Sequence, residues 1–267
     1  MYVDSHCHLS FPAMLENITA IRADMAAAHV DRALCICTTL EEFEQVHALA
    51  TGYDNFWCSA GVHPDNEGVR EPSLGDLLAL AALPRVVAIG ETGLDYFRLN
   101  GRSLGEMEWQ RDRFRTHIRA ARATALPLVV HTRSASDDTV AILKEEGADA
   151  PGGVFHCFTE TEAVARAALD LGFLISFSGI ITFKTASDLR DVARFVPLDR
   201  CLIETDSPYL SPVPFRGRTN SPAHVPFVAR QIAELKGLPV ETVAEATTRN
   251  FERLFKLPAI NANEVPA

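Results

Sequence analysis

The chain contains 267 residues, of which 47% are hydrophobic and 22% are charged, and its 25 basic and 35 acidic residues leave a formal net charge of −10. The apolar content is sufficient for a substantial core, and the acidic balance argues against coating of long nucleic acid by counterion release. Nuclease chemistry is not excluded, because divalent metals can supply positive charge where a phosphate lies.

The sequence shows no leader segment and no apolar run long enough to span a bilayer, and its six cysteines form no CxxC pair. We therefore expect a reduced, cytoplasmic protein without disulfides and without membrane association. Cys35 and Cys37 lie in an apolar, strand-like segment, which favours buried thiols over a metal site.

Short β-rich segments alternate with segments of helical spacing along the chain. The β-rich segments are nearly continuous apolar runs, as is typical of parallel strands buried on both faces. They lie at residues 1–5, 32–39, 56–64, 86–93, 126–133, 153–158, 173–179 and 201–207.

The clearest helical segment covers residues 107–126, and further helices are predicted at 186–196, 222–237 and 241–255. Met107, Phe114, Ile118, Ala121 and Ala125 share one face of the first of these. Three arginines repeat every four residues on the same helix, a pattern more typical of a solvated surface than of a phosphate track.

Eight strand–helix units in a chain of this length predict a single (β/α)₈ TIM barrel over residues 1–257, with a loose tail at 258–267. An open doubly wound sheet is the alternative, but no GxGxxG motif follows a strand. In such a barrel the active site lies at the C-terminal ends of the strands.

Most of the predicted strands end in a histidine or an acid. These residues are His6, His8, His63, Glu91, His131, His156 and Asp206. Imidazoles bind first-row metals, and a carboxylate is the usual bridge between two ions. Our hypothesis is that one metal is bound by His6, His8 and Asp206, a second by His131 and His156, and that Glu91 bridges them.

Each residue also has a structural interpretation. A single strand-end histidine such as His63 is more often a hydrogen-bonded core residue, Asp206 could start a turn, and Glu91 could pair with an arginine. The joint pattern favours a site, because chance rarely places a histidine or an acid at the ends of so many strands. His29, His47 and His117 lie in helical segments and are left out of it.

The strand-end residues and the motifs around them resemble those of the TatD family of metal-dependent hydrolases, within the amidohydrolase superfamily. The matching stretches, in chain order, are VDSHCHL, GVHP, IGETGLDY, QRDRF, LPLVVHTR, FHCF, ISFSGIITF, LIETDSPYLSPVPFRGRTNSP and TTRNFERLF. The resemblance implies a TIM barrel, up to two divalent ions on the six ligands His6, His8, Glu91, His131, His156 and Asp206, and hydrolysis of DNA. One departure is Thr159–Glu160, where the family often has Ser-Gly; an acid at the mouth of the site would repel an anionic substrate.

The expected chemistry is attack on a phosphodiester by a metal-activated hydroxide. Asp206 is expected to act as general base, and Glu204, on the same side of its strand, to support the site or to form a structural ion pair. His63 is expected to bind a phosphate oxygen or to protonate the leaving group. Arg133 and Arg216 could each offer a bidentate fork to a phosphate.

No lysine ends a predicted strand, so a carbamylated lysine is not expected, and either Glu91 is the bridge or only one metal is bound. The donor set does not decide among Zn²⁺, Mn²⁺ and Mg²⁺. The sequence predicts a deoxyribonuclease acting on single-stranded DNA or exposed ends, with no obligate protein partner. The alternatives are a small-molecule amidohydrolase or lactonase using the same two-metal site, and a catalytically silent binding protein, which would have to lack a ligand.

Overall fold

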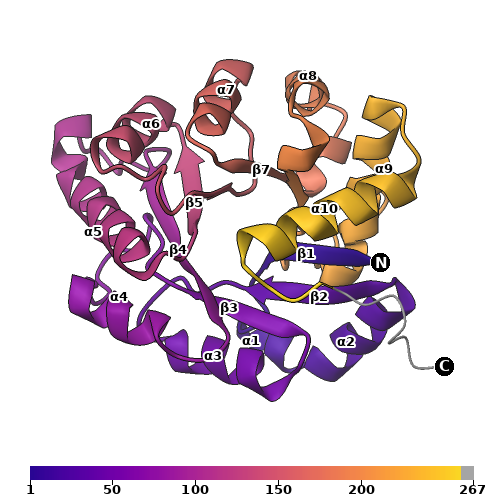
Figure 1. The fold of residues 1–267 in the computed structure, drawn as a ribbon, viewed down its shortest axis with the longest axis horizontal. Helices are drawn as coiled ribbons and strands as arrows, with labels where there is room; N and C mark the ends of the chain where they lie inside the picture. The colour runs from indigo at the N-terminus through magenta and orange to yellow at the C-terminus, as the bar shows by residue number, and fades with distance from the viewer. Residues whose placement is uncertain (260–267) are drawn as a thin grey trace.

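Parallel strands follow one another in chain order around a single sheet, with helices packed on its outer side (Figure 1). The computed structural model describes residues 1–259. The eight strands are β1 (Tyr2–Cys7), β2 (Val30–Cys35), β3 (Phe56–Ala60), β4 (Val86–Asp95), β5 (Leu128–Arg133), β6 (Gly153–Phe155), β7 (Leu174–Phe177) and β8 (Cys201–Ile203).

The sheet closes on itself where β8 meets β1. Cys7 and Ser207 form a parallel bridge. The N–H of His8 donates to the Ser207 carbonyl at 2.8 Å, and the N–H of Asp206 donates to the His6 carbonyl at 2.9 Å. The predicted (β/α)₈ barrel is therefore confirmed, and the open doubly wound sheet is excluded.

The helices alternate with the strands as predicted. They are α1 (Pro12–Leu15), α2 (Ile18–Ala27), α3 (Phe43–Gly52), α4 (Leu74–Ala81), α5 (Glu108–Thr124), α6 (Ser136–Glu145), α7 (Glu162–Asp170), α8 (Ser187–Phe195), α9 (Val225–Lys236) and α10 (Val240–Leu254). Helix α5 ends one residue before Ala125, which takes a left-handed φ of 54°. Ala125 is exposed and does not belong to the apolar face predicted for it.

Several strands end earlier than their apolar runs predict. β3 ends at Ala60, β6 at Phe155 and β8 at Ile203, so His63, His156 and Asp206 lie in the loops that follow. The reason is that an apolar run in the sequence indicates a buried segment and not a paired strand, and these loops stay buried after regular strand pairing stops. The N–H of His156, for example, still donates to the Val130 carbonyl at 3.0 Å.

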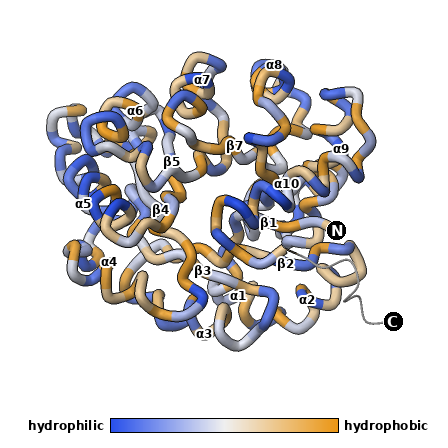
Figure 2. The backbone as a smooth tube through the Cα atoms, viewed as in Figure 1, coloured by the Kyte–Doolittle hydropathy of each residue, from blue (hydrophilic) through white to orange (hydrophobic). Residues whose placement is uncertain are grey.

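Two hydrophobic layers support the barrel. One lies between the strands and the helices, whose residues alternate between hydrophobic and hydrophilic (Figure 2). The other contains a residue from each strand, such as Val3 and Trp57, together with Phe251 and Phe255 at the end of α10. Helix α10 therefore closes the N-terminal end of the barrel and leaves the opposite end open for a site.

Among residues 1–259, no helix combines the length and the apolar character needed to cross a bilayer. The carbonyl of Pro258, at the start of the predicted tail, accepts a hydrogen bond from Nη1 of Arg32 at 2.7 Å. The rest of that predicted tail, residues 260–267, lies outside the described residues.

Candidate metal centre

The two histidines of the first strand point to one side. The register of β1 against β2 shifts between Asp4 and Cys7, and Asp4 accepts a hydrogen bond from the His6 N–H at 3.2 Å. Cys7 turns outward into the layer between strands and helices, while Nε2 of His6 and Nε2 of His8 lie 3.3 Å apart. The predicted convergence of the two imidazoles is confirmed.

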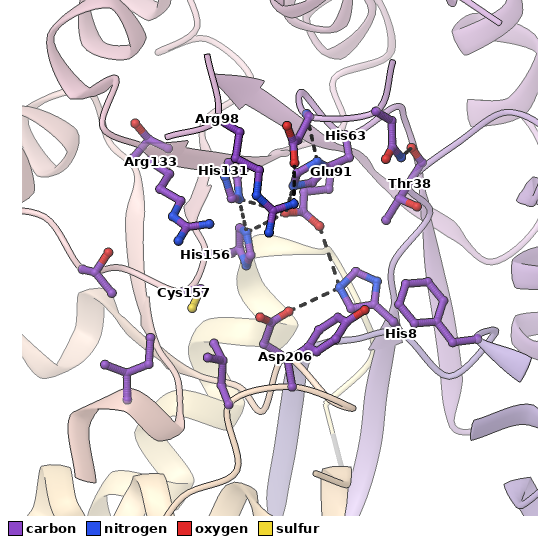
Figure 3. A pocket seen from close by; sticks show the side chains of 18 residues that line it. His8, Thr38, His63, Glu91, Arg98, His131, Arg133, His156, Cys157 and Asp206 are labelled. Atoms are coloured by element: carbon purple, nitrogen blue, oxygen red, sulfur yellow. Dashed lines mark hydrogen bonds and ion pairs between the residues drawn. The ribbon is translucent and has the colours of Figure 1, made fainter. Parts of the chain in front are cut away.

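Glu91, on β4, lies at the centre of the cluster (Figure 3). Its Oε2 lies 3.3 Å from Nε2 of His6 and 3.9 Å from Nε2 of His8. Its Oε1 lies 2.7 Å from Nε2 of His156 and 3.2 Å from Nδ1 of His131. One oxygen of the carboxylate thus faces His6 and His8, and the other faces His131 and His156 and also His63 at 3.3 Å, an arrangement that suits a bridging ligand.

Asp206 completes the half of the cluster formed by β1. Its Oδ1 lies 3.3 Å from Nε2 of His8 and 3.5 Å from Nε2 of His6. Its side chain is 14% exposed, compared with 3% for Glu91 and 0% for Glu204. Of these three carboxylates, Asp206 is therefore the most accessible from the open end of the barrel.

Two further carboxylates support the other half. Nε2 of His131 lies 3.1 Å from Oδ2 of Asp95, and Nδ1 of His156 lies 3.3 Å from Oε1 of Glu204. In each case the second ring nitrogen faces Glu91. A carboxylate on the outer nitrogen of a ligand histidine orients the ring and makes it a stronger donor.

Gly61 and Gly93 lie where the backbones of neighbouring strands come close together near Glu91. A Cβ on Gly93, which has a φ of +130°, would lie 2.0 Å from the His131 carbonyl oxygen. A Cβ on Gly61 would lie 2.5 Å from the Gly90 carbonyl carbon. Strands β3, β4 and β5 can approach this closely only because these side chains are absent, and Glu91 is brought between the histidines as a result.

The electrostatics of the cluster keep its acids ionised. Burial alone would raise the pKa of Glu91, but the side chains of His156, His63 and His6 hold it well below its ordinary value. Burial also opposes ionisation of Asp206, yet the neighbouring imidazoles lower its pKa. Against the effect of its burial, the charge of Glu91 raises the pKa of His156 well above the ordinary value.

The cluster fits divalent metal ions. Its groups of three potential ligands, each with donor atoms within 4.8 Å of one another, are His6–His8–Glu91, His6–His156–Asp206 and His63–Glu91–His131. Within the described residues, the buried Oε2 of Glu91 makes no hydrogen bond of acceptable geometry, although Nε2 of His6 lies 3.3 Å away, and an ionised oxygen in that position is stabilised by a cation. Imidazole and carboxylate donors suit Zn²⁺ and other first-row metals.

His63 differs from the other histidines in its hydrogen bonds. Its Nδ1 accepts from the Asp65 N–H at 3.0 Å, so the neutral ring carries its proton on Nε2. That nitrogen faces Oε1 of Glu91 at 3.3 Å. His63 is therefore arranged as a hydrogen-bond donor, and we favour this over the ligand role that its proximity to Glu91 and His131 alone would suggest.

A cavity of about 710 Å³ opens above the cluster. It is lined by the candidate ligands His8, Glu91, His131, His156 and Asp206, by His63, and by Phe11, Arg98, Arg133 and Tyr209, among others. Sequence reasoning missed Arg98, which lies in the loop after β4 and whose Nη1 is 3.6 Å from Oδ2 of Asp65. The sequence did contain a signal for this role, because Arg98 follows the end of β4, the strand that carries Glu91, by only three residues.

Some residues singled out from the sequence do not line this cavity: His6 and Glu204 are fully buried, and Arg216 and Glu160 lie elsewhere. Arg216 lies with its guanidinium 3.6 Å from the centre of the Phe183 ring. Glu160 accepts a hydrogen bond from Oγ of Ser136 at 2.5 Å and lines a neighbouring hollow. The expectation that Glu160 repels anions from the mouth is therefore wrong, because its side chain is directed away. Thr159 does line the central cavity.

Helix α5 supports the site through buried polar residues that sequence reasoning did not select. Arg113 donates to the carbonyls of His63 at 2.8 Å and of Asn66 at 2.9 Å. Nε2 of His117 accepts from the Val62 N–H at 3.0 Å. Both residues therefore hold the loop that carries His63, and the QRDRF stretch, which contains Arg113, was the signal for this.

The comparisons with known proteins agree with this geometry. A family model described as TatD related DNase matches residues 3–256. The chain is 48% identical over 261 residues to the uncharacterized metal-dependent hydrolase YcfH of Escherichia coli K12, covering 96% of each chain. It is 36% identical over 259 residues to the 3'-5' ssDNA/RNA exonuclease TatD of Citrobacter rodentium, covering 94% of this chain and 97% of that one.

Solved structures extend the comparison. The crystal structure of YjjV, a TatD homologue from Escherichia coli, superposes with a TM-score of 0.89 at 32% identity and covers 96% of this chain and 98% of that chain. A PTE-like lactonase of Deinococcus radiodurans, at 18% identity and a TM-score of 0.66 over 95% of both chains, shares the fold alone. Sequence, fold and ligand cluster together establish that this chain belongs to the TatD family of metal-dependent hydrolases.

Proposed function

We propose that this protein is a two-metal phosphodiesterase that hydrolyses single-stranded DNA or exposed DNA ends. The observation that carries the proposal is Glu91, whose two oxygens face different imidazoles, Oε2 that of His6 and Oε1 that of His156, below a cavity that is also lined by arginines. The relative from Citrobacter rodentium, named a 3'-5' ssDNA/RNA exonuclease, supports a nucleic acid substrate.

The ligand assignment follows the two halves of the cluster. His6, His8 and Asp206 would hold one ion, His131 and His156 would hold the other, and Glu91 would bridge them. Divalent ions in these positions lower the pKa of coordinated water and neutralise phosphoryl oxygens. Zn²⁺, Mn²⁺ and Mg²⁺ remain the candidates.

The chain's own residues supply proton transfer and substrate binding. Asp206, the accessible carboxylate, accepts the proton of the attacking water. His63, neutral with its proton on Nε2, donates a hydrogen bond to a phosphate oxygen. Protonation of the leaving oxygen, the other role expected from the sequence, would need a proton on Nδ1 as well, and the hydrogen bond from the Asp65 N–H opposes this. Arg133, on the rim, binds a substrate phosphate, and Arg98 lines the same cavity and adds positive charge.

Asp95 and Glu204 act as positioning residues. Each faces the outer nitrogen of one histidine, Asp95 that of His131 and Glu204 that of His156. Glu204 also accepts a hydrogen bond from the Cys157 N–H at 2.7 Å, which fixes its carboxylate. Of the two interpretations of Glu204, these contacts favour support of a ligand histidine.

The test is cleavage of single-stranded oligonucleotides with Mn²⁺, Mg²⁺ or Zn²⁺, compared with lactones, cyclic amides and phosphotriesters. We expect chelator-sensitive cleavage of the oligonucleotides, and we expect Glu91→Ala to lose both turnover and bound metal. Glu160→Gln, which changes an acid outside the cavity, is the matched control. Turnover of lactones without cleavage of any DNA would instead establish the small-molecule hydrolase.

A further inference from the structure

Two aromatic rings lie at one side of the cavity mouth. The Phe11 ring stacks on the His8 ring, with centroids 4.9 Å apart and an interplanar angle of 17°. Tyr209 meets Phe11 edge to face, with centroids 6.2 Å apart. Both rings line the cavity, and Tyr209 is 55% exposed, so aromatic surface faces the space directly above the ligands.

The backbone couples both rings to metal ligands. Phe11 follows His8 by three residues, and Tyr209 follows Asp206 by three residues. In each case a turn closes the interval, because the Phe11 N–H donates to the His8 carbonyl at 3.2 Å and the Tyr209 N–H donates to the Asp206 carbonyl at 3.0 Å. Nδ2 of Asn220 donates to the Tyr209 carbonyl at 2.7 Å. The rings are therefore held at a set distance from the ligand atoms.

Positive charge lies at the opposite side of the same cavity. Figure 3 shows Arg133 on the far side of His131 and Arg98 drawn between His131 and Glu91, both on the side of the cluster away from His8 and Asp206. The guanidinium of Arg133 is 3.6 Å from the centre of the Phe97 ring, a stacking contact that engages the face of the guanidinium and not its in-plane N–H donors. The cavity is thus aromatic on the β1 and β8 side and cationic on the β4 and β5 side.

A group that fits this division has a flat aromatic part joined to anions. Nucleotides have this chemistry, since bases stack on aromatic side chains and phosphates bind arginine. Bases inside a duplex are stacked on both faces, and the terminal pair exposes its outer face alone, so an unpaired nucleotide is free to turn its base into the cavity. We propose, building on the proposed function, that Phe11 and Tyr209 form a nucleobase-stacking subsite that selects unpaired nucleotides beside the scissile phosphate.

The test compares cleavage of two single-stranded oligonucleotides of the same sequence. One is intact, and in the other the terminal nucleotides are replaced by stable tetrahydrofuran abasic sites, first at one end and then, in a second version, at the other end. For wild-type protein we expect the intact strand to be cleaved with a kcat/KM about tenfold higher, the range expected for one stacked base. Tyr209→Leu should lose this preference and cleave both strands at the rate of the abasic one. Tyr209→Phe should keep it, because the ring and not the hydroxyl makes the contact.

Two controls separate stacking from damage to the site. Tyr53→Leu makes the same change at a tyrosine outside the cavity and should leave the preference for intact strands unchanged. Phe11→Leu is measured together with bound metal, since Phe11 contacts the ring of His8; its metal content should stay at the wild-type level while the preference falls.

The outcomes distinguish this proposal from the proposed function. Equal cleavage of intact and abasic strands by wild-type protein, or an equal loss on both strands in Tyr209→Leu, would overturn the stacking subsite and leave the nuclease in place. If no strand is cleaved with any of the three metals, the proposed function fails and the subsite with it.

Discussion

The side-chain amide of Gln110 binds both polar groups of the Asp95 backbone: Oε1 accepts from its N–H at 2.9 Å, and Nε2 donates to its carbonyl at 3.0 Å. Gln110 is 1% exposed. Because the Asp95 carboxylate faces His131, the amide on α5 sets the position of a ligand histidine two contacts away.

Gln110→Leu should weaken both the fold and the metal centre. The substitution leaves a buried N–H and carbonyl unpaired, which costs about 2–3 kcal/mol of unfolding free energy. Urea unfolding measures that loss, and metal analysis should show that less metal is retained. Gln110→Glu keeps the acceptor oxygen, so its unfolding free energy and its metal content should lie between those of the wild type and of Gln110→Leu. Wild-type metal content in Gln110→Leu would disprove the link to His131.

His117 should make stability fall in mild acid. Burial lowers its pKa to about 4, against an ordinary value of about 6.5. The unfolded chain therefore binds the proton first, and the folded protein loses up to about 3 kcal/mol as the pH falls from 6.5 to 4. His117→Gln cannot titrate, so its unfolding free energy, measured with urea across this window, should fall less steeply. Parallel curves for the two proteins would contradict this.

Glu204→Gln should lower activity more than stability. The amide oxygen can still accept from the Cys157 N–H, but the negative charge beside Nδ1 of His156 is lost. We expect activity or metal affinity to fall about 10- to 100-fold, measured as turnover against added metal. If Glu204 forms only a structural ion pair, the thermal unfolding temperature would fall while turnover at saturating metal stayed the same.

Arg133→Met should weaken substrate binding while leaving the chemical step largely intact. We expect KM for a single-stranded oligonucleotide to rise about tenfold, and the slope of log affinity against log salt to shrink by about 0.7, the value for one phosphate contact on a single strand. Arg216→Met is the matched control, because Arg216 stacks on Phe183 outside the cavity. An equal rise in KM for both variants would restore the sequence-based role of Arg216.

The barrel and the clustering of histidines and acids at one end of it could be predicted because a parallel barrel brings the ends of all its strands to one rim. His131 and Asp206 are far apart in sequence, yet knowing that each lies at or just beyond a strand end was enough to place them together. The position of α5 against the loops was not accessible in this way. Periodicity indicates which face of a helix is buried, but it does not indicate that Gln110 and Arg113 meet particular carbonyls.

The directions of side chains in loops were the other feature that could not be predicted from the sequence. Glu160 follows a ligand strand closely, as Arg98 does, but the first is bound to Ser136 and the second lines the cavity. The difference depends on which partner each side chain meets across the surface. A single sequence carries no record of such pairings.

The seam between β1 and β8 joins the earliest residues of the chain to some of the latest, and Phe251 and Phe255 fill the barrel from below only once α10 exists. During translation, His6 and His8 therefore leave the ribosome long before Asp206 and the plug that stabilises the barrel. A nascent chain that ends before Asp206 cannot hold the complete cluster, so the proposed metal centre can form only after β8 and the loop that follows it have been made.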